Sequence, residues 1–383
     1  MKQTEIYLDH AATTTMAPEA RNHFFELLEA GVANSSSAHR PGSAAAALLE
    51  VARETLAAKL GCSTQEIFFC SGGTEANNWV LQRSVSDWKR AMPNHESLPH
   101  VITASTEHSS VATTAARLKE EGLIEWSEVG VDSLGYIDLK HLKSLLKPTT
   151  VLVSISHGNN EIGTVQDLEK IGSICHEGGV RFHADACQSF CHTEIRLNQL
   201  PVDLMTLSGH KIRGPKGVGA LFIRKGVELS PLVYGGKQEK GLRPGTTSVE
   251  LISAFAKAAT TWNQKTISDL SNIKKYTIEE LKRRFPEITF NGEIDKPSLC
   301  HVVSFTFPKL ESKTLHRRLA ESGVACSTGA ACGTGKSDRS AVLLALGRAD
   351  HLAHQLRFSF SPVTTKAEIE EALNRLESIV ASL

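Results

Sequence analysis

The sequence has no excess of charge of either sign, because Lys and Arg together number 42 and Asp and Glu also number 42. Without a basic excess, nucleic acid and anionic membrane surfaces are not expected partners. No apolar run approaches the roughly 20 residues that span a bilayer. We therefore expect no nucleic-acid binding and no membrane association.

Signals for export and for disulfide formation are also missing. Residues Met1–His10 lack an apolar core and include Glu5 and Asp9, which suits neither secretion nor organelle import. The eight cysteines have no disulfide-scaffold spacing, and 383 residues can bury a sizeable core without covalent staples. We expect a cytoplasmic protein with reduced thiols and room for two domains.

Short apolar segments alternate with helical patterns between residues 67 and 223. This alternation predicts an α/β fold with a mostly parallel sheet covered on both faces. Ligands of such sheets bind beyond the carboxyl ends of the strands. The predicted strands are Ile67–Cys70, Val101–Ala104, Val151–Ile155, Val180–His183, Val202–Leu207 and Val218–Ile223.

Helices are predicted on both sides of this region. Pro18 opens one, Ser43 is a plausible cap for a second that ends at Gly61, and a long one covers about Asn263–Phe285. The long helix looks like a bridge to a smaller α+β domain. We expect a large domain of residues 15–262 and a small domain of residues 1–14 and 263–383.

Polar residues follow the predicted strands and form a candidate anion site. The run from Ser71 to Asn78 is a glycine turn that opens a helix, and it includes Gly73 and Thr74. Free backbone N–H groups and hydroxyls at a helix N-terminus suit a phosphate. Ser208 and His210, after a later strand, supply further donors.

The remaining strand ends carry an imidazole, an acid and an amine. His108 follows one strand, and Asp185 follows another with Gln188 three residues on. A buried aspartate needs a partner, and a protonated pyridine nitrogen is a suitable one. Lys211 ends a buried strand, where a desolvated amine can react with an aldehyde. Together these groups are the parts needed to hold pyridoxal phosphate as a Schiff base.

The same motifs resemble those of the pyridoxal-phosphate-dependent cysteine desulfurases, which have the class-V aminotransferase-like fold. The resemblance covers nearly the whole chain and keeps the order of the motifs. The matching segments are Tyr7–Thr14, Ser71–Asn78, Asn159–Gly163, Asp185–Ser189, Ser208–Gly219, Gly241–Thr246 and Ser327–Cys332.

The resemblance implies a fold-type-I homodimer that converts L-cysteine to L-alanine and passes sulfur to an acceptor such as an iron–sulfur scaffold protein. It also implies a role for each residue of the candidate site. Lys211 forms the Schiff base, and His108 stacks on the ring and takes part in catalysis. Asp185 and Gln188 contact the ring nitrogen and hydroxyl, Gly73, Thr74, Ser208 and His210 hold the phosphate, and Thr246 reaches the phosphate from the partner subunit. Asn160 contacts the cofactor and, with Arg357, binds the substrate.

Cys332 distinguishes a desulfurase from an aminotransferase. It lies between glycines in a polar stretch, where a thiol is exposed and can ionise, and the resemblance makes it the persulfide carrier. Cys326, six residues earlier, stands where the family usually has an aliphatic residue. Selenocysteine lyase and aminotransferase activities remain alternatives on the same fold.

A metal-binding module is the alternative from a different class. His183, Cys187, Cys191 and His192 bring soft ligands close together in the sequence. Their spacing fits no common zinc pattern, and Asp185 and Gln188 lie among them. We therefore expect no metal site.

Overall fold

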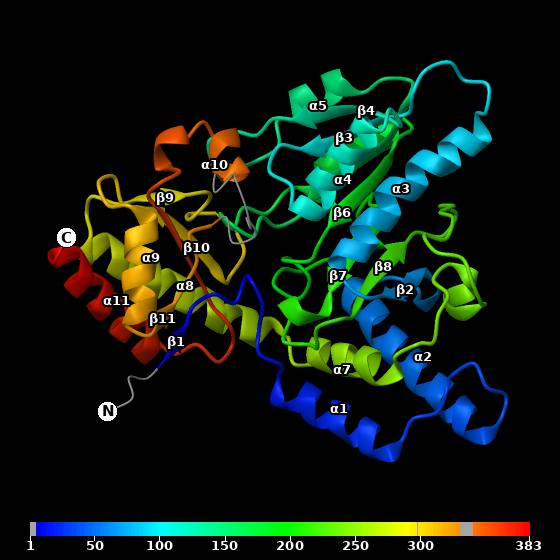
Figure 1. Ribbon diagram of the computed structural model, residues 1–383, viewed down its shortest axis with the longest axis horizontal. Helices are drawn as coiled ribbons and strands as arrows, with labels where there is room; N and C mark the ends of the chain where they lie inside the picture. The colour runs from blue at the N-terminus through cyan, green and yellow to red at the C-terminus, as the bar shows by residue number, and fades with distance from the viewer. Residues whose placement is uncertain (1–4, 297, 330–339) are drawn as a thin grey trace.

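A seven-stranded sheet forms the core of the larger part of the computed structural model, which describes residues 5–296, 298–329 and 340–383 (Figure 1). Six of its strands are parallel to one another, and β8 runs antiparallel to both of its neighbours. In order across the sheet the strands are β2 (Ile67–Cys70), β8 (Gly219–Ile223), β7 (Leu204–Ser208), β6 (Arg181–Asp185), β5 (Thr150–Ser156), β3 (His100–Ala104) and β4 (Glu125–Val129).

Both faces of this sheet are buried. Successive side chains of a strand point to opposite faces, and Leu204 packs in one apolar cluster while Met205 packs in the other. In the same way, Val101 packs in the cluster of Leu204 and Ile102 packs in the cluster of Met205. The helices of this part of the chain are α1 (Pro18–Ala30), α2 (Arg40–Leu60), α3 (Gly73–Ala91), α4 (Ser109–Glu120), α5 (Leu139–Leu145), α6 (Leu168–Glu177) and α7 (Val249–Thr260).

A long helix, α8 (Gln264–Arg284), leads to a smaller group of elements on the other side of the molecule (Figure 1). There β12, β10 and β9 form an antiparallel sheet in that order, and β1 pairs in parallel with β11. The elements are β1 (Ile6–Tyr7), β9 (Thr289–Asn291), β10 (Val302–Thr306), α9 (Ser312–Glu321), β11 (Val324–Ala325), α10 (Ala341–Ala345), β12 (Gln355–Ser359) and α11 (Lys366–Ala381).

The predicted α/β fold is confirmed, and each predicted strand of the large sheet exists to within two residues at its ends. Two details differ. Helix α2 begins at Arg40 and is capped by His39, whose Nδ1 accepts from the N–H of Gly42 at 3.2 Å, so Ser43 is not its cap. Pro41 explains the early start, because proline lacks an N–H and fits the first turn. Within the described ranges, no helix combines the length and apolarity needed to cross a membrane.

Candidate active site

The carboxyl ends of β2 and β7 lie on either side of the start of β8. Cys70 and Ser208 both pair with Gly219, so the glycine turn after β2 comes close to the residues that follow β7. A Cβ on Gly219 would lie 2.7 Å from the Cα of Gly72. Only glycine allows this close approach of the two backbones.

A cavity of about 370 Å³ opens at this point, and the four predicted phosphate residues, Gly73, Thr74, Ser208 and His210, all line it. It also contains the first turn of α3, where backbone N–H groups have no partner within the helix. Burial, with Lys211 and Lys216 nearby, lowers the pKa of His210 to about 4, so its ring is neutral at pH 7. Unpaired N–H groups and hydroxyls fit a phosphate.

Asp185, at the end of β6, is buried and accepts two hydrogen bonds. The backbone N–H of Cys187 donates to Oδ1 at 2.9 Å, and Asn77 Nδ2 donates to Oδ2 at 2.7 Å. Asn77 also donates to Ser110 Oγ at 2.8 Å, and this oxygen lies 2.8 Å from His108 Nδ1. These donors hold the carboxylate in one orientation, which suits a partner such as a protonated ring nitrogen.

His108 is the N-cap of α4, and its Nδ1 accepts from the N–H of Ser110 at 3.1 Å. Burial is the main cause that lowers its pKa, Lys211 acts in the same direction, and Asp185 opposes them. The ring is therefore neutral, with its proton on Nε2. A neutral imidazole at this place fits the predicted aromatic contact with a cofactor ring.

The N-terminal segment contacts the amine of Lys211. Nζ donates to the carbonyl oxygens of Ala11 at 2.6 Å and Ala12 at 2.9 Å. Thr14 secures this segment, because its hydroxyl donates to the carbonyl of His210 at 2.7 Å. Two backbone carbonyls thus orient the amine.

Arg357, in β12, is fully buried beside Asn160. Its Nη1 donates to the carbonyl oxygen of Asn160 at 3.0 Å, and its Nη2 forms an ion pair with Asp9 Oδ1 at 2.6 Å. The Nε atom is buried and has no partner among the described residues. A guanidinium with an unused donor suits a carboxylate ligand. Asp9 was not predicted from the sequence as its partner.

Thr246 stands apart from this cluster. Thr246 is exposed and does not line the phosphate cavity of its own chain. Its loop is tied to the glycine turn, since Arg243 forms an ion pair with Glu75 at 2.9 Å. Cys332 lies outside the described residues.

The residues that flank positions 330–339 contact the site. Ser327 pairs with Arg357 through two backbone hydrogen bonds, of 2.7 and 3.1 Å. On the other side, Ser340 donates to Glu161 Oε2 at 2.6 Å, next to Asn160 in the chain. Cys326 is buried, and desolvation raises the pKa of its thiol to about 12.

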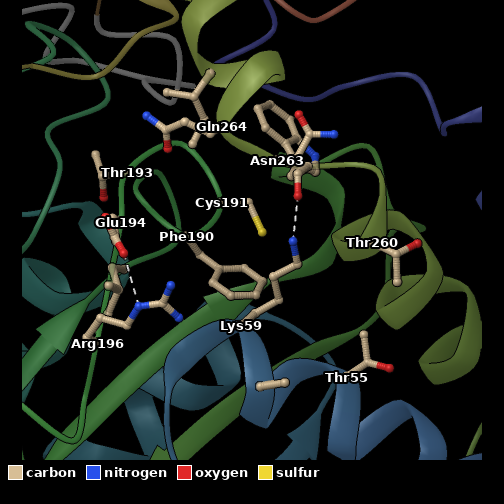
Figure 2. A pocket seen from close by; sticks show the side chains of 14 residues that line it. Thr55, Lys59, Phe190, Cys191, Thr193, Glu194, Arg196, Thr260, Asn263 and Gln264 are labelled. Carbon is tan, nitrogen blue, oxygen red and sulfur yellow. Dashed lines mark hydrogen bonds and ion pairs between the residues drawn. The ribbon is translucent and has the colours of Figure 1, made fainter.

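A second depression, of about 570 Å³, lies between the end of α2, the segment 190–196 and the junction of α7 and α8 (Figure 2). Lys59 donates there to the carbonyl of Trp262, and Arg196 pairs with Glu194 at 3.0 Å. Cys191 lines its wall. None of the predicted cofactor or substrate residues lines it.

The four residues of the metal alternative do not gather around one point. Both ring nitrogens of His183 are used, by Ser154 Oγ at 2.8 Å and Thr206 Oγ1 at 2.9 Å. Within residues 5–296, 298–329 and 340–383 there is no group of three or more His, Cys, Asp or Glu side chains that could hold a metal ion.

The substitution Gly73→Ala tests the phosphate turn. A Cβ on Gly73 would overlap the Sγ of Cys187, and overpacking of this kind costs about 1–3 kcal/mol. We expect the affinity for pyridoxal phosphate, measured by fluorescence titration of the apoprotein, to fall about tenfold.

The matched control is Gly73→Ala combined with Cys187→Ala. Without the Sγ, the nearest atoms to the new Cβ are 3.7 and 3.9 Å away, which is ordinary contact. The double variant should therefore regain most of the affinity. Equal loss in both variants would show that Cys187 is not the obstacle.

Comparison with known proteins agrees with this geometry. The family model for "Aminotransferase class-V" matches residues 6–372. A protein of Dictyoglomus turgidum named "Cysteine desulfurase IscS" is 36% identical, over 99% of this chain and 95% of its own length. "Cysteine desulfurase, mitosomal" from Trachipleistophora hominis is 40% identical, over 99% of this chain and 87% of its own length.

Solved structures agree as well. A "NIFS-like protein" superposes with a TM-score of 0.90 at 31% identity, over 99% of this chain and all of that one. The structure titled "SspA in complex with cysteine" has a TM-score of 0.80, also at 31% identity, over 94% of this chain and 100% of that one. Members of the matched family are pyridoxal-phosphate-dependent, and the residues at the strand ends fit that cofactor. This chain belongs to the class-V aminotransferase family.

Proposed function

We propose that this protein is a cysteine desulfurase, which converts L-cysteine to L-alanine and leaves the sulfur on Cys332 as a persulfide. One observation carries the assignment to this reaction rather than to transamination. One flank of the segment that contains Cys332 pairs with Arg357, which is proposed to bind the substrate, through Ser327. The other flank contacts Glu161, the neighbour of Asn160 in the chain, through Ser340. Full-length relatives named cysteine desulfurase support it further.

The cofactor is held by residues from several strand ends. Gly73, Thr74, Ser208 and His210 take the phosphate, and His108, Asp185 and Gln188 contact the ring face, ring nitrogen and ring hydroxyl. Lys211 would hold the cofactor through its aldehyde group, and Thr246 would reach the phosphate from the partner subunit. When bound, pyridoxal phosphate withdraws electrons from the Cα of the amino acid and so makes its proton acidic.

The residues of the chain orient the substrate and move its protons. Arg357 binds the carboxylate of L-cysteine, with Asn160 beside it. Once substrate is bound, Lys211 Nζ takes the proton from Cα, and the carbonyls of Ala11 and Ala12 orient this amine. Asp185 keeps a proton on the ring nitrogen.

The sulfur transfer balances without an added oxidant. The Cys332 thiolate attacks the sulfur of cysteine, an S–S bond forms, and the Cβ–S bond breaks. The electron pair of that bond stays with carbon, and Cβ gains a proton. The products are L-alanine and a persulfide, which a sulfur-acceptor protein such as an iron–sulfur scaffold removes.

We also propose the domain division and the assembly. Residues 15–262 form the large domain, and residues 1–14 and 263–383 form the small one. The pairing of β1 with β11 supports placing the N-terminus in the small domain. A homodimer supplies Thr246, whose exposure on its own chain suits a contact across subunits. Seven described cysteines are free, which supports the reducing cytoplasm as the compartment.

Incubation with L-cysteine alone tests the function. Alanine should form without a keto acid, and mass spectrometry of the digested protein should find one added sulfur on Cys332. Alanine that appears only with a keto-acid acceptor would instead indicate an aminotransferase. Turnover of selenocysteine but not of cysteine would indicate a selenocysteine lyase.

The substitution Asp185→Asn should lower kcat on the order of 10²-fold, which corresponds to about 3 kcal/mol of transition-state stabilisation. Asparagine keeps the shape but loses the charge that holds the ring nitrogen protonated. It also turns an NH₂ group toward one of two donors, Asn77 Nδ2 or the N–H of Cys187.

Exchanging the two side chains, with Asn77→Asp added to Asp185→Asn, separates these effects. The exchange restores a hydrogen bond between positions 77 and 185 but leaves no charge on position 185. We expect kcat to stay low while the thermal midpoint recovers. A near-normal kcat in either variant would refute the role of Asp185.

A further inference from the structure

The side-chain amide of Gln188 is fixed at both ends. Its Nε2 donates to the carbonyl oxygen of Ala11 at 2.8 Å, and its Oε1 lies 3.2 Å from His301 Nε2. A carbonyl oxygen can only accept, so the contact with Ala11 settles which end of the amide is nitrogen. His301 Nε2 must then carry a hydrogen and donate it. One N–H of Gln188 remains for a ligand.

His301 reaches Gln188 from the other group of elements, directly before β10. Its ring stacks on that of His192, with centroids 3.8 Å apart, and His192 meets the edge of Trp262 at 4.5 Å. Both histidines are buried. Burial is the main cause that holds the pKa of His301 well below its usual range. Four basic side chains act in the same direction, namely His192, Lys274, His10 and Lys211, so the ring is neutral.

Packing alone does not account for an imidazole at this place. The Nδ1 atoms of His301 and His192 are both buried without a hydrogen-bond partner among the described residues. An unsatisfied buried acceptor costs about 1–3 kcal/mol, which an apolar ring of similar size avoids. Metal binding does not account for it either, because the described residues contain no suitable group. Among the described residues, the hydrogen bond that the His301 ring does make is the one that Nε2 donates to Oε1 of Gln188.

We propose that His301 is a positioning residue that acts on the cofactor through Gln188. Its N–H holds the amide so that the remaining N–H of Gln188 faces the ring oxygen of pyridoxal phosphate. The inference rests on the proposed function, which gives Gln188 that contact. A donor there stabilises negative charge on the ring oxygen and lowers its affinity for a proton.

Two substitutions distinguish the effect of the N–H donor of His301 from the effect of its ring. His301→Phe keeps a ring against His192 and removes the donor, whereas His301→Gln keeps a donor. His192→Phe is the matched control, because it leaves the contact between His301 and Gln188 intact. If His301→Phe does not fold, His301→Met removes the donor with a more adaptable side chain.

The readouts are two properties of the bound cofactor that do not depend on turnover. In His301→Phe the pH midpoint of its visible absorbance should rise by about one unit, and its affinity should fall about threefold to tenfold. In His301→Gln and in His192→Phe, the pH midpoint of the visible absorbance should stay within about 0.3 unit of the midpoint of the unmodified protein.

A double-mutant cycle with Gln188→Leu decides whether His301 acts through Gln188. In the Gln188→Leu background, His301→Phe should add no further shift in the midpoint or the affinity. Equal effects in both backgrounds, or no shift in the first, would overturn the inference. A protein that binds no pyridoxal phosphate at all would contradict the proposed function instead.

Discussion

Replacing Lys211 with alanine is expected to remove the visible absorbance of the protein-bound cofactor and to lower alanine formation by at least about 10³-fold. The proposed mechanism uses the amine of Lys211 twice, as the group bonded to the cofactor and as the base for the Cα proton. Among the described residues, no other lysine donates to the carbonyls of Ala11 and Ala12. Absorbance spectra and alanine quantification on the purified variant measure both effects.

Lys211→Arg is the matched control for this prediction. Arginine keeps a cation that can donate to the same two carbonyls, but it remains protonated and cannot act as a base or an amine nucleophile. We expect it to fold like the unmodified protein and to be as inactive as the alanine variant. If either variant kept both the absorbance and the turnover, Lys211 would have no place in the mechanism.

The residues at the strand ends could be predicted because they follow local patterns. Each apolar run between residues 67 and 223 that was assigned as a strand is one, and parallel strands deliver their carboxyl ends to one edge. The cavity that holds Thr74, Ser208 and His210 follows from that geometry. Strand β4 was missed, because Glu125, Ser127 and Glu128 give it a polar composition and it lies at the edge of the sheet.

The contacts that orient these residues could not be predicted, since they join distant parts of the chain. Asp9 pairs with Arg357 across 348 positions, and His301 reaches Gln188 across 113. For Asn77, which donates a hydrogen bond to Asp185, the sequence contains one indication of a role. Asn77 lies on the first turns of the helix that the glycine turn opens. Nothing local distinguishes His301 from an ordinary core histidine.

The substitution Cys332→Ala should abolish alanine formation from L-cysteine while leaving the cofactor bound. The Cβ–S bond breaks only when a thiolate attacks the sulfur, so the reaction loses its nucleophile. In the proposed mechanism the earlier proton transfer does not need Cys332, because it is assigned to Lys211. We therefore expect the Cα proton of bound cysteine to exchange with deuterated solvent, which NMR of the recovered cysteine measures.

Cys326→Ala is the matched control, because it removes the other thiol of the same stretch. Burial raises the pKa of Cys326 to about 12, so almost none of it is thiolate at pH 7 and it should not serve as the nucleophile. This variant should keep alanine formation and carry the added sulfur on Cys332. Added sulfur on Cys326 of the unmodified protein would instead show that sulfur passes between the two thiols. Alanine formed from cysteine by Cys332→Ala at the unmodified rate would exclude the proposed desulfurase mechanism.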